Sequence, residues 1–267
     1  HVPLFTKWLK VVRDAGTRVQ MIVDHPDDLS NNMSSPGVKV ATTKGSQRLR
    51  EATKIRITNE AGTDFSADTT EFGAFHQYGF ADEPGHFDHW GAGHLYTFPN
   101  ENSANGRVVI QPGDIVVLPY NNYVRDPITL EVREGYIREI KGDGHDARLM
   151  RYWLKENMND KNDLDGYAIS HLGWGTNPYC RWDNMELNGT HNDRNNGNAR
   201  GLMGSFLFST GPNTQGGGTR ATTGHYDVPM MHCDVYLDDV KIIEQGVFLD
   251  KSLESPKEER GGYLNAL

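Results

Sequence analysis

Short runs of alternating apolar and polar residues dominate the chain from about Lys54 onward. This period of two is typical of β-strands with one buried face, and the Gly- and Pro-containing segments between the runs are typical of tight turns. The pattern predicts strands at Lys54–Thr58, Thr63–Phe65, Leu95–Phe98, Gly106–Ile110, Asp114–Leu118, Ile128–Glu131, Tyr136–Ile140, Tyr167–Ser170, Phe206–Phe208 and Val235–Leu237. We therefore expect a β-dominated domain over most of the chain.

Helical spacing of apolar residues occurs in two places. Between Leu4 and Val12 it predicts a helix, with Gly16 as its C-cap and a strand at Arg18–Val23 after it. A second helix is predicted at Asp146–Glu156. The opening of the chain therefore has the order of an α/β fragment, whereas the remainder is typical of an α+β domain rich in strands.

A turn-forming segment at Ser34–Gly37 suggests a domain boundary. We expect residues 1–36 to be the remnant of an N-terminal α/β domain and residues 37–267 to form a β-rich, metal-binding catalytic domain. The first residue is His1 and not Met, so we also expect that an N-terminal portion precedes this sequence in the gene product.

Charge and cysteine content narrow the function classes. The 27 Lys and Arg residues against 36 Asp and Glu residues give a net charge of -9, with no basic run, which argues against nucleic acid or anionic lipid as a partner. The apolar stretches are far shorter than a membrane-spanning helix requires. With two cysteines in 267 residues, a disulfide framework is excluded, and we expect a cytoplasmic protein.

Histidine is the most informative residue type, because neutral imidazole is a common ligand of transition metals. His225 and Asp227 are two positions apart, so in an extended strand both side chains point to the same face and can share one ion. A bare His-x-Asp also occurs at polar strand ends. His171 follows a predicted strand, and the glycines after it permit close backbone approach. Together the three residues could form a two-histidine, one-carboxylate facial triad of the kind that binds Fe(II).

Two further histidines are candidates for a substrate pocket. His89 lies beside Trp90 in a segment of acids, imidazoles and aromatics, which suits proton transfer near a planar ligand but is also compatible with a surface loop. His94 is either a pocket residue or an ordinary strand histidine. Trp174 is a candidate apolar wall for a flat ligand, with a place in the core as the alternative.

Five segments of the sequence resemble the 2,5-dihydroxypyridine 5,6-dioxygenase family. They are Tyr78–Gly85, Asp88–Trp90, Pro99–Ala104, Ser170–Gly175 and Phe206–Thr214, and the resemblance extends over nearly the whole chain. It implies a fold similar to the M29 aminopeptidases. It also implies an enzyme that uses non-haem Fe(II) and O₂ to open a dihydroxypyridine ring to N-formylmaleamate.

The resemblance also implies roles for individual residues. It places the iron ligands on His171, His225 and Asp227, the same three residues that spacing suggested. The histidine of the family's Asp-His-Trp motif, which lies close to the iron ligands, falls on His89, its general base and acid falls on His1, and a pocket position falls on Gln77, whereas at His94 the dioxygenases carry an aromatic residue. The family has a glutamate where this chain has Gln77, which keeps a hydrogen-bonding group but removes the charge. We expect a small aromatic N-heterocycle and O₂ as substrates and a homo-oligomer as the assembly.

Two other function classes remain open at this point. The related metallo-aminopeptidases use two metal ions, but two of their ligand positions fall on Leu207 and near Thr214, which cannot bind a metal through their side chains in that role. One metal ion is therefore the better interpretation. A non-catalytic relative that binds a ligand without turnover is the third possibility, and the amide at Gln77 is compatible with it.

Overall fold

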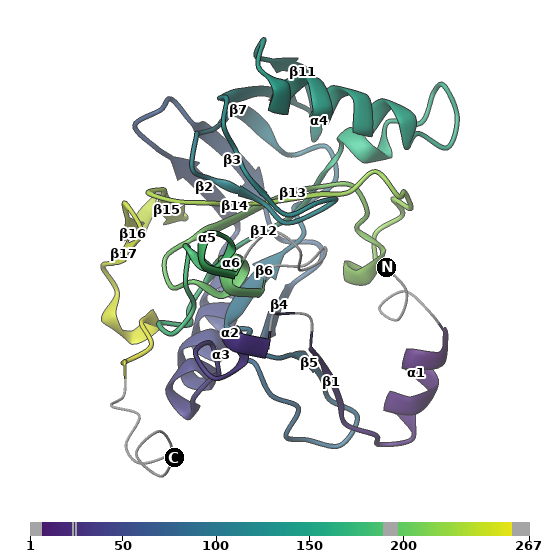
Figure 1. Ribbon diagram of the computed structural model, residues 1–267. Coiled ribbons are helices and arrows are strands. Elements are labelled where there is room, and N and C mark those ends of the chain that lie inside the picture. Colours follow the sequence, from purple (N-terminus) through teal and green to yellow (C-terminus); the bar gives the residue numbers. More distant parts are fainter. Residues whose placement is uncertain (1–6, 23, 25, 189–196, 258–267) are drawn as a thin grey trace.

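Two antiparallel sheets packed against each other form the centre of the computed structural model, which describes residues 7–22, 24, 26–188 and 197–257 (Figure 1). The larger sheet has eight strands in the order β11-β10-β7-β3-β2-β15-β16-β17. In chain order these are β2 (Lys54–Thr58), β3 (Asp64–Asp68), β7 (Asn105–Ile110), β10 (Ile128–Arg133), β11 (Tyr136–Lys141), β15 (Asp234–Leu237), β16 (Val240–Glu244) and β17 (Val247–Phe248).

The smaller sheet has five strands in the order β14-β13-β12-β6-β4, and all neighbours are antiparallel. Its strands are β4 (Ala74–Gln77), β6 (His94–Thr97), β12 (Ile169–Gly175), β13 (Phe206–Thr210) and β14 (Tyr226–Met230). Two short pairs complete the sheets: β1 (Val19–Met21) runs parallel to β5 (Phe87–His89), and β8 (Ile115–Val116) is antiparallel to β9 (Asn122–Tyr123).

Burial explains the sequence patterns of the two sheets. In β10 of the larger sheet, buried positions alternate with partly exposed ones, as expected for a sheet with one covered face. In β13 and β14 every residue is buried, so these strands do not alternate, and apart from Asp227 and the hydroxyl residues Ser209 and Thr210 they are apolar or aromatic. The rings of Phe65 and Phe208 meet edge to face across the sheet interface, with centroids 6.0 Å apart.

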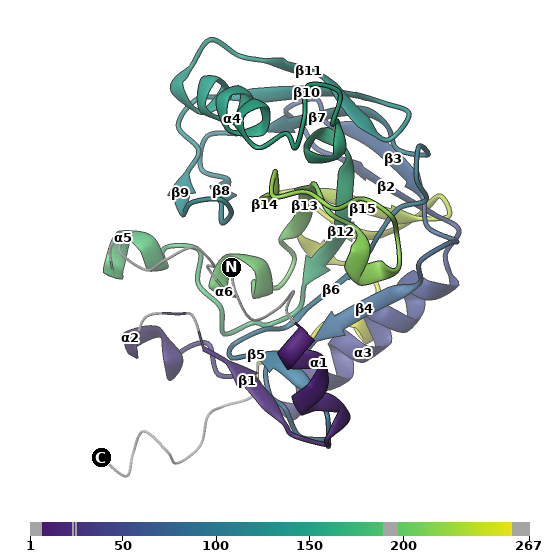
Figure 2. The same cartoon turned by 90° about the vertical axis from the view of Figure 1, so that its right-hand side faces the viewer.

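Helices lie around the sheets (Figure 2). They are α1 (Lys7–Asp14), α2 (Pro26–Leu29), α3 (Pro36–Glu51), α4 (His145–Glu156), α5 (Asn184–Asn188) and α6 (Gly197–Gly201), with 3₁₀ turns at η1 (Asp165–Tyr167), η2 (Thr214–Gly216) and η3 (Lys251–Leu253). Helix α3 packs against β4 and β6, whereas α4 packs against β11 at the other end of the molecule. None of the described helices is both long and apolar enough to cross a membrane.

The predicted strands are largely confirmed, but one long helix was missed. Helix α3 begins where the sequence suggested a turn: Ser35 is its N-cap, the Ser35 hydroxyl accepts a hydrogen bond from the Val38 amide at 3.4 Å, and Pro36 occupies the first turn. Its buried face consists mostly of small or polar residues, which hid the helical period. Gly45 allows close packing, since a Cβ there would overlap the Leu95 side chain.

The N-terminal segment shares a sheet with a distant part of the chain. Strand β1 pairs with β5 in the register Met21 to His89, so the segment before Ser34 is attached directly to the loop that carries His89. The predicted division into residues 1–36 and 37–267 stays a prediction.

Candidate metal centre

Three predicted ligands converge at one end of the smaller sheet. His171 comes from β12, His225 directly precedes β14, and Asp227 lies within β14, so the three residues lie on the two sides of β13. One ligand atom from each lies within 4.8 Å of the other two. His171 Nε2 is 3.0 Å from Asp227 Oδ1, and His225 Nε2 is 3.4 Å from the same oxygen. Among the described residues, these three form the one group of at least three His, Cys, Asp or Glu side chains whose ligand atoms all lie within 4.8 Å of one another.

The protonation of His225 decides what the cluster can bind. Its Nδ1 lies 2.6 Å from the carbonyl oxygen of Thr210, and because a carbonyl oxygen only accepts, Nδ1 donates. In the neutral ring Nε2 then carries a lone pair, and it faces Asp227 Oδ1. That oxygen is buried and accepts no well-directed hydrogen bond from any described residue. Two buried acceptors that face each other repel, and a cation between them removes the conflict.

The charges of the cluster also suit a cation. Burial on its own raises the pKa of Asp227, but His225, His171 and Arg200 outweigh it and hold that pKa well below its usual range. Burial lowers the pKa of His225, so its imidazole is neutral near pH 7. Arg200 Nη2 binds the second carboxylate oxygen, Oδ2, at 2.9 Å and leaves Oδ1 directed at the histidines. An ionised carboxylate and a neutral imidazole are the forms in which Asp227 and His225 can bind a metal ion.

The spacing of the donors fits a first-row transition metal. With metal to ligand bonds of about 2.1 Å, two ligands at right angles are about 3.0 Å apart, which is close to the two separations measured from Asp227 Oδ1. Two imidazoles and one carboxylate are the donor set of mononuclear non-haem Fe(II) sites, which keep further coordination positions open. The three residues therefore fit a single iron ion.

An aromatic wall borders the cluster. The ring of Tyr96 lies 5.2 Å from that of His171, and the ring of Phe98 lies 6.1 Å from it on the same side. Phe75 on the neighbouring strand stacks on Tyr96 at 5.7 Å. Burial raises the pKa of Tyr96 to about 12, so its phenol is protonated at neutral pH. The stacked rings of Phe75 and Tyr96, with Phe98 nearly perpendicular to them, make the sheet face beside the candidate metal ligands apolar.

Gln77, His89 and His94 continue this wall beyond Tyr96. Gln77 and His94 are paired opposite each other on β4 and β6, and the rings of His94 and Tyr96 stack with centroids 6.0 Å apart. The Nδ1 of His89 donates to Gln77 Oε1 at 2.8 Å. Burial, with a smaller effect of Arg200, lowers the pKa of His89 to about 3. The same two causes, in that order, hold the pKa of His94 well below its usual value.

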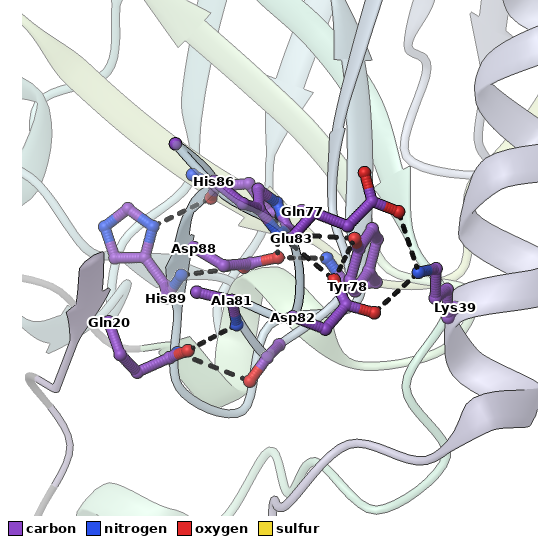
Figure 3. Close-up of polar contacts among 12 residues, drawn as sticks. Gln20, Lys39, Gln77, Tyr78, Ala81, Asp82, Glu83, His86, Asp88 and His89 are labelled. Carbon is purple, nitrogen blue, oxygen red and sulfur yellow. Dashed lines mark hydrogen bonds and ion pairs between the residues drawn. The ribbon is translucent and has the colours of Figure 1, made fainter. Parts of the chain in front are cut away.

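A buried carboxylate holds the loop that presents Gln77 and His89 (Figure 3). Asp88 accepts hydrogen bonds from the amides of Tyr78, at 2.9 Å, and His89, at 2.7 Å, and so ties the two ends of the loop together. Burial raises the pKa of Asp88 to about 7 against the opposing effect of its backbone donors. On the outer side, Lys39 binds Asp82 at 2.6 Å and Asp82 accepts from the Tyr78 hydroxyl at 2.7 Å.

Comparisons with known proteins identify the family of this chain. The family model described as NicX, 2,5-dihydroxypyridine 5,6-dioxygenase, matches residues 1–250. A curated 2,5-dihydroxypyridine 5,6-dioxygenase from Pseudomonas putida is 41% identical over 248 residues, which are 92% of this chain and 67% of the relative. This chain belongs to the 2,5-dihydroxypyridine 5,6-dioxygenase family.

Two solved structures are similar in fold to this dioxygenase-family chain. The structure of 2,5-dihydroxypyridine dioxygenase from Pseudomonas putida KT2440 matches with a TM-score of 0.85 and 38% identity, over 97% of this chain and 71% of that one. AmpT from Thermus thermophilus matches with a TM-score of 0.53 and 12% identity, over 84% of this chain and 57% of AmpT. At that identity AmpT supports the fold alone. The predicted fold class is confirmed.

The structure brings most of the predicted site residues of this family member together, but not all of them. His171, His225 and Asp227 form one cluster, and Gln77, His89 and His94 lie along its wall. Trp174 is fully buried in the hydrophobic core near Gly45, so its position does not support the predicted contact with substrate. His1 lies outside the described residues. The roles of all these residues in catalysis stay predictions.

Two residues that organise the site were not found from the sequence. Arg200 lies on α6 at the end of an Asn-rich segment and belongs to no recognisable motif, so only the fold brings it to Asp227. Asp88 was visible within the acidic segment around His89, but its backbone contacts depend on the loop geometry. The glycines after His171 do allow another group to lie close to the backbone. At Gly173 that group is the Leu95 carbonyl of β6.

Proposed function

We propose that this chain is an Fe(II)-dependent, ring-cleaving dioxygenase that opens 2,5-dihydroxypyridine, or a close hydroxylated N-heterocycle, with O₂ to N-formylmaleamate. Family membership supports the dioxygenase class. The observation that carries the metal assignment is the pair of acceptors, His225 Nε2 and Asp227 Oδ1, that face each other at 3.4 Å beside His171. Bound Fe(II) would supply open positions at which O₂ and the ring are brought together for electron transfer.

The side chains of this protein would prepare the site in three ways. His171, His225 and Asp227 would hold the ion, with the Thr210 carbonyl fixing the orientation of His225. Arg200 holds Asp227 ionised and in place. Tyr96 offers an apolar ring face on which an aromatic ring can lie, and the buried Phe98 packs edge-on beside it.

Proton transfer would fall to the histidines near the ring. His89 is neutral, and its Nε2 makes no hydrogen bond to any described residue, so it would orient the ring by accepting a hydrogen bond from a substrate hydroxyl. His1 is the general base and acid that the family resemblance suggested. Both oxygen atoms of O₂ enter the product, so the overall reaction needs no external reductant.

No specific observation favours the aminopeptidase alternative. A dinuclear hydrolase needs a second set of ligands, and in the described part of the chain one candidate cluster is present. Leu207 is buried in the sheet and Thr214 lies in an exposed 3₁₀ turn, so neither adds a ligand. A cytoplasmic location and a homo-oligomeric assembly are further proposals.

Anaerobic reconstitution tests the proposed function. The protein is loaded with Fe(II), mixed with 2,5-dihydroxypyridine, and then exposed to O₂ while O₂ uptake and loss of the ultraviolet band of the ring are followed. We expect one O₂ consumed per ring, and a loss of activity in the His225→Ala variant. Iron binding without O₂ uptake would point to a different ring substrate, and an absence of iron binding would refute the metal assignment.

A further inference from the structure

A carboxylate from the N-terminal segment reaches the short helix that carries Arg200. Asp24 lies between β1 and α2, and its Oδ1 accepts a hydrogen bond from the amide of Gly197, the first residue of α6, at 3.0 Å. Its Oδ2 accepts a hydrogen bond from Asn32 Nδ2 at 2.9 Å. Asp24 and Gly197 are 173 residues apart in the sequence, so only the fold brings them together.

The contact between Asp24 and Gly197 is close. A Cβ on residue 197 would lie 2.6 Å from Asp24 Oδ2, so the carboxylate can take this position because residue 197 is glycine. The amides in the first turn of a helix have no acceptor within the helix, and a carboxylate is one of the acceptors that suit them best. Asp24 therefore fixes the start of α6.

The other end of α6 is attached to the sheet that holds the candidate metal ligands. The Gly201 carbonyl accepts from the amide of Asn177, just after β12, at 2.8 Å, and the Met203 amide donates to the Asn177 carbonyl at 3.1 Å. Between the two attachments, Arg200 Nη2 donates to Asp227 Oδ2 at 2.9 Å. The place of the Arg200 side chain therefore depends on how both ends of this one short helix are held.

The charge of Asp24 responds to its surroundings. Burial raises the pKa of Asp24 to about 6, against the opposing effect of the hydrogen bonds from Gly197 and Asn32. Two charged groups act on it from the neighbouring helices: Asp28 of α2 raises this pKa, and Arg200 of α6 lowers it. Asp24 is therefore ionised at pH 8 and mostly protonated at pH 5.

We propose that Asp24 is a positioning residue of the metal centre. It holds α6 where Arg200 binds one oxygen of Asp227 and leaves the other oxygen, Oδ1, directed at the histidines. Asp24 acts through Arg200 and is not itself a ligand. This inference rests on the proposed function for the identity of the metal site, but the chain of contacts from Asp24 to Asp227 does not itself include the ion.

Nitrogen NMR of the metal-free protein tests this chain of contacts directly. Guanidinium protons held in a buried ion pair exchange slowly with water, and the loss of one signal in Arg200→Lys assigns Arg200. We expect exchange of the Arg200 Nη protons to be about 10-fold faster in Asp24→Ala than in the wild type. Gly197→Ala should have the same effect, because its Cβ would displace the carboxylate. Unchanged exchange in both variants would overturn the proposal.

Zn(II) affinity, measured by competition with a chromogenic chelator, reports on the metal centre itself. Loss of a group that orients a ligand typically lowers metal affinity by 10- to 100-fold, so Asp24→Ala should lose about 10-fold at pH 8. Asp24→Asn keeps an acceptor for the Gly197 amide but no charge. It should lose about 3-fold at pH 8 and match the wild type at pH 5, where Asp24 is protonated. A deficit of Asp24→Asn that is equal at both pH values would refute the proposal.

Asp114→Ala is the matched control. Asp114 is also buried, accepts from the amides of Gln111 and Met231 at 2.8 Å and 3.0 Å, and has a pKa that burial raises to about 6. Met231 follows β14, whereas His225 precedes that strand. Asp114→Ala should lower stability but keep Zn(II) affinity within about 2-fold of the wild type.

The remaining outcomes separate the two proposals. An equal loss of Zn(II) affinity in Asp114→Ala and Asp24→Ala would indicate general loosening and overturn the role of Asp24. A wild-type protein that shows the expected exchange of Arg200 but binds no Zn(II) would refute the metal assignment of the proposed function, and not the positioning of Arg200 by Asp24.

Discussion

Replacing Asp227 with Asn tests the electrostatic account of the metal centre. The substitution conserves the shape of the side chain but removes the single negative charge among the three proposed ligands. It also removes the anion that Arg200 contacts at 2.9 Å. Two properties should therefore change together, metal affinity and the stability of the metal-free protein.

The magnitudes follow from the distances. Two unit charges 4 Å apart in a medium of effective dielectric constant 20 interact by about 4 kcal/mol, and the ion is divalent and closer, so metal affinity should fall by roughly 1000-fold or more. In the metal-free protein Asp227→Asn leaves the guanidinium of Arg200 buried without its carboxylate. Breaking one side of a buried pair costs about 3 kcal/mol or more of unfolding free energy.

Competition with a chromogenic chelator for Zn(II) measures the affinity, and urea denaturation in excess chelator measures the stability. His225→Ala is the matched variant: it removes a ligand but leaves the Arg200 and Asp227 pair, so it should lower affinity with a smaller loss of metal-free stability. If Asp227→Asn binds Zn(II) within about 10-fold of the wild type, the ligand assignment is wrong.

Three further predictions concern the fold around the site. Gly173→Ala should destabilise the protein by about 2 kcal/mol or more in urea denaturation, because its Cβ would overlap the Leu95 carbonyl of β6; a neutral effect would contradict that contact. Ser35→Ala should cost about 1 kcal/mol through loss of the α3 N-cap, and Ser35→Asp should restore it, both measured by thermal denaturation. Because the pKa of Asp88 is raised to about 7, its contribution to stability is present below about pH 4 and is lost as the pH rises through 7. The unfolding free energy of the wild type minus that of Asp88→Asn should therefore fall by a few kcal/mol between about pH 4 and 8, and a flat difference would contradict the shift.

The candidate metal ligands could be predicted because their signal is local. His225 directly precedes β14 and Asp227 lies within it, two residues later, so the period of an extended chain places them on one face without any knowledge of the fold. His171 was added because of its position after a strand and by family resemblance. Arg200 could not be found in this way, because its contact with Asp227 depends on the packing of a short helix against β12.

The strands were easier to predict than the helix α3. Strands such as β10 bury every second residue. The pattern of burial and the pattern of apolar residues in the sequence therefore repeat with the same period of two. In α3 the buried face includes Thr42, Gly45 and Ser46, and the Thr42 hydroxyl is bonded to that of Thr176 at 2.6 Å. A helix that packs through small and polar residues has no apolar stripe, and its N-cap residues look like a turn.

The candidate metal site exists only in the folded chain, because its residues come from β12 and β14, which are held apart by β13. Ser209 of β13 is the partner of Asp227 in β14, and its hydroxyl accepts a hydrogen bond from the His171 amide at 2.8 Å. A slip of one residue in either pairing would turn Asp227 or His171 to the opposite face. Metal binding is therefore coupled to the register of β12, β13 and β14. Before any ion binds, Arg200 compensates part of the charge of Asp227, which lets the sheet close around this buried carboxylate.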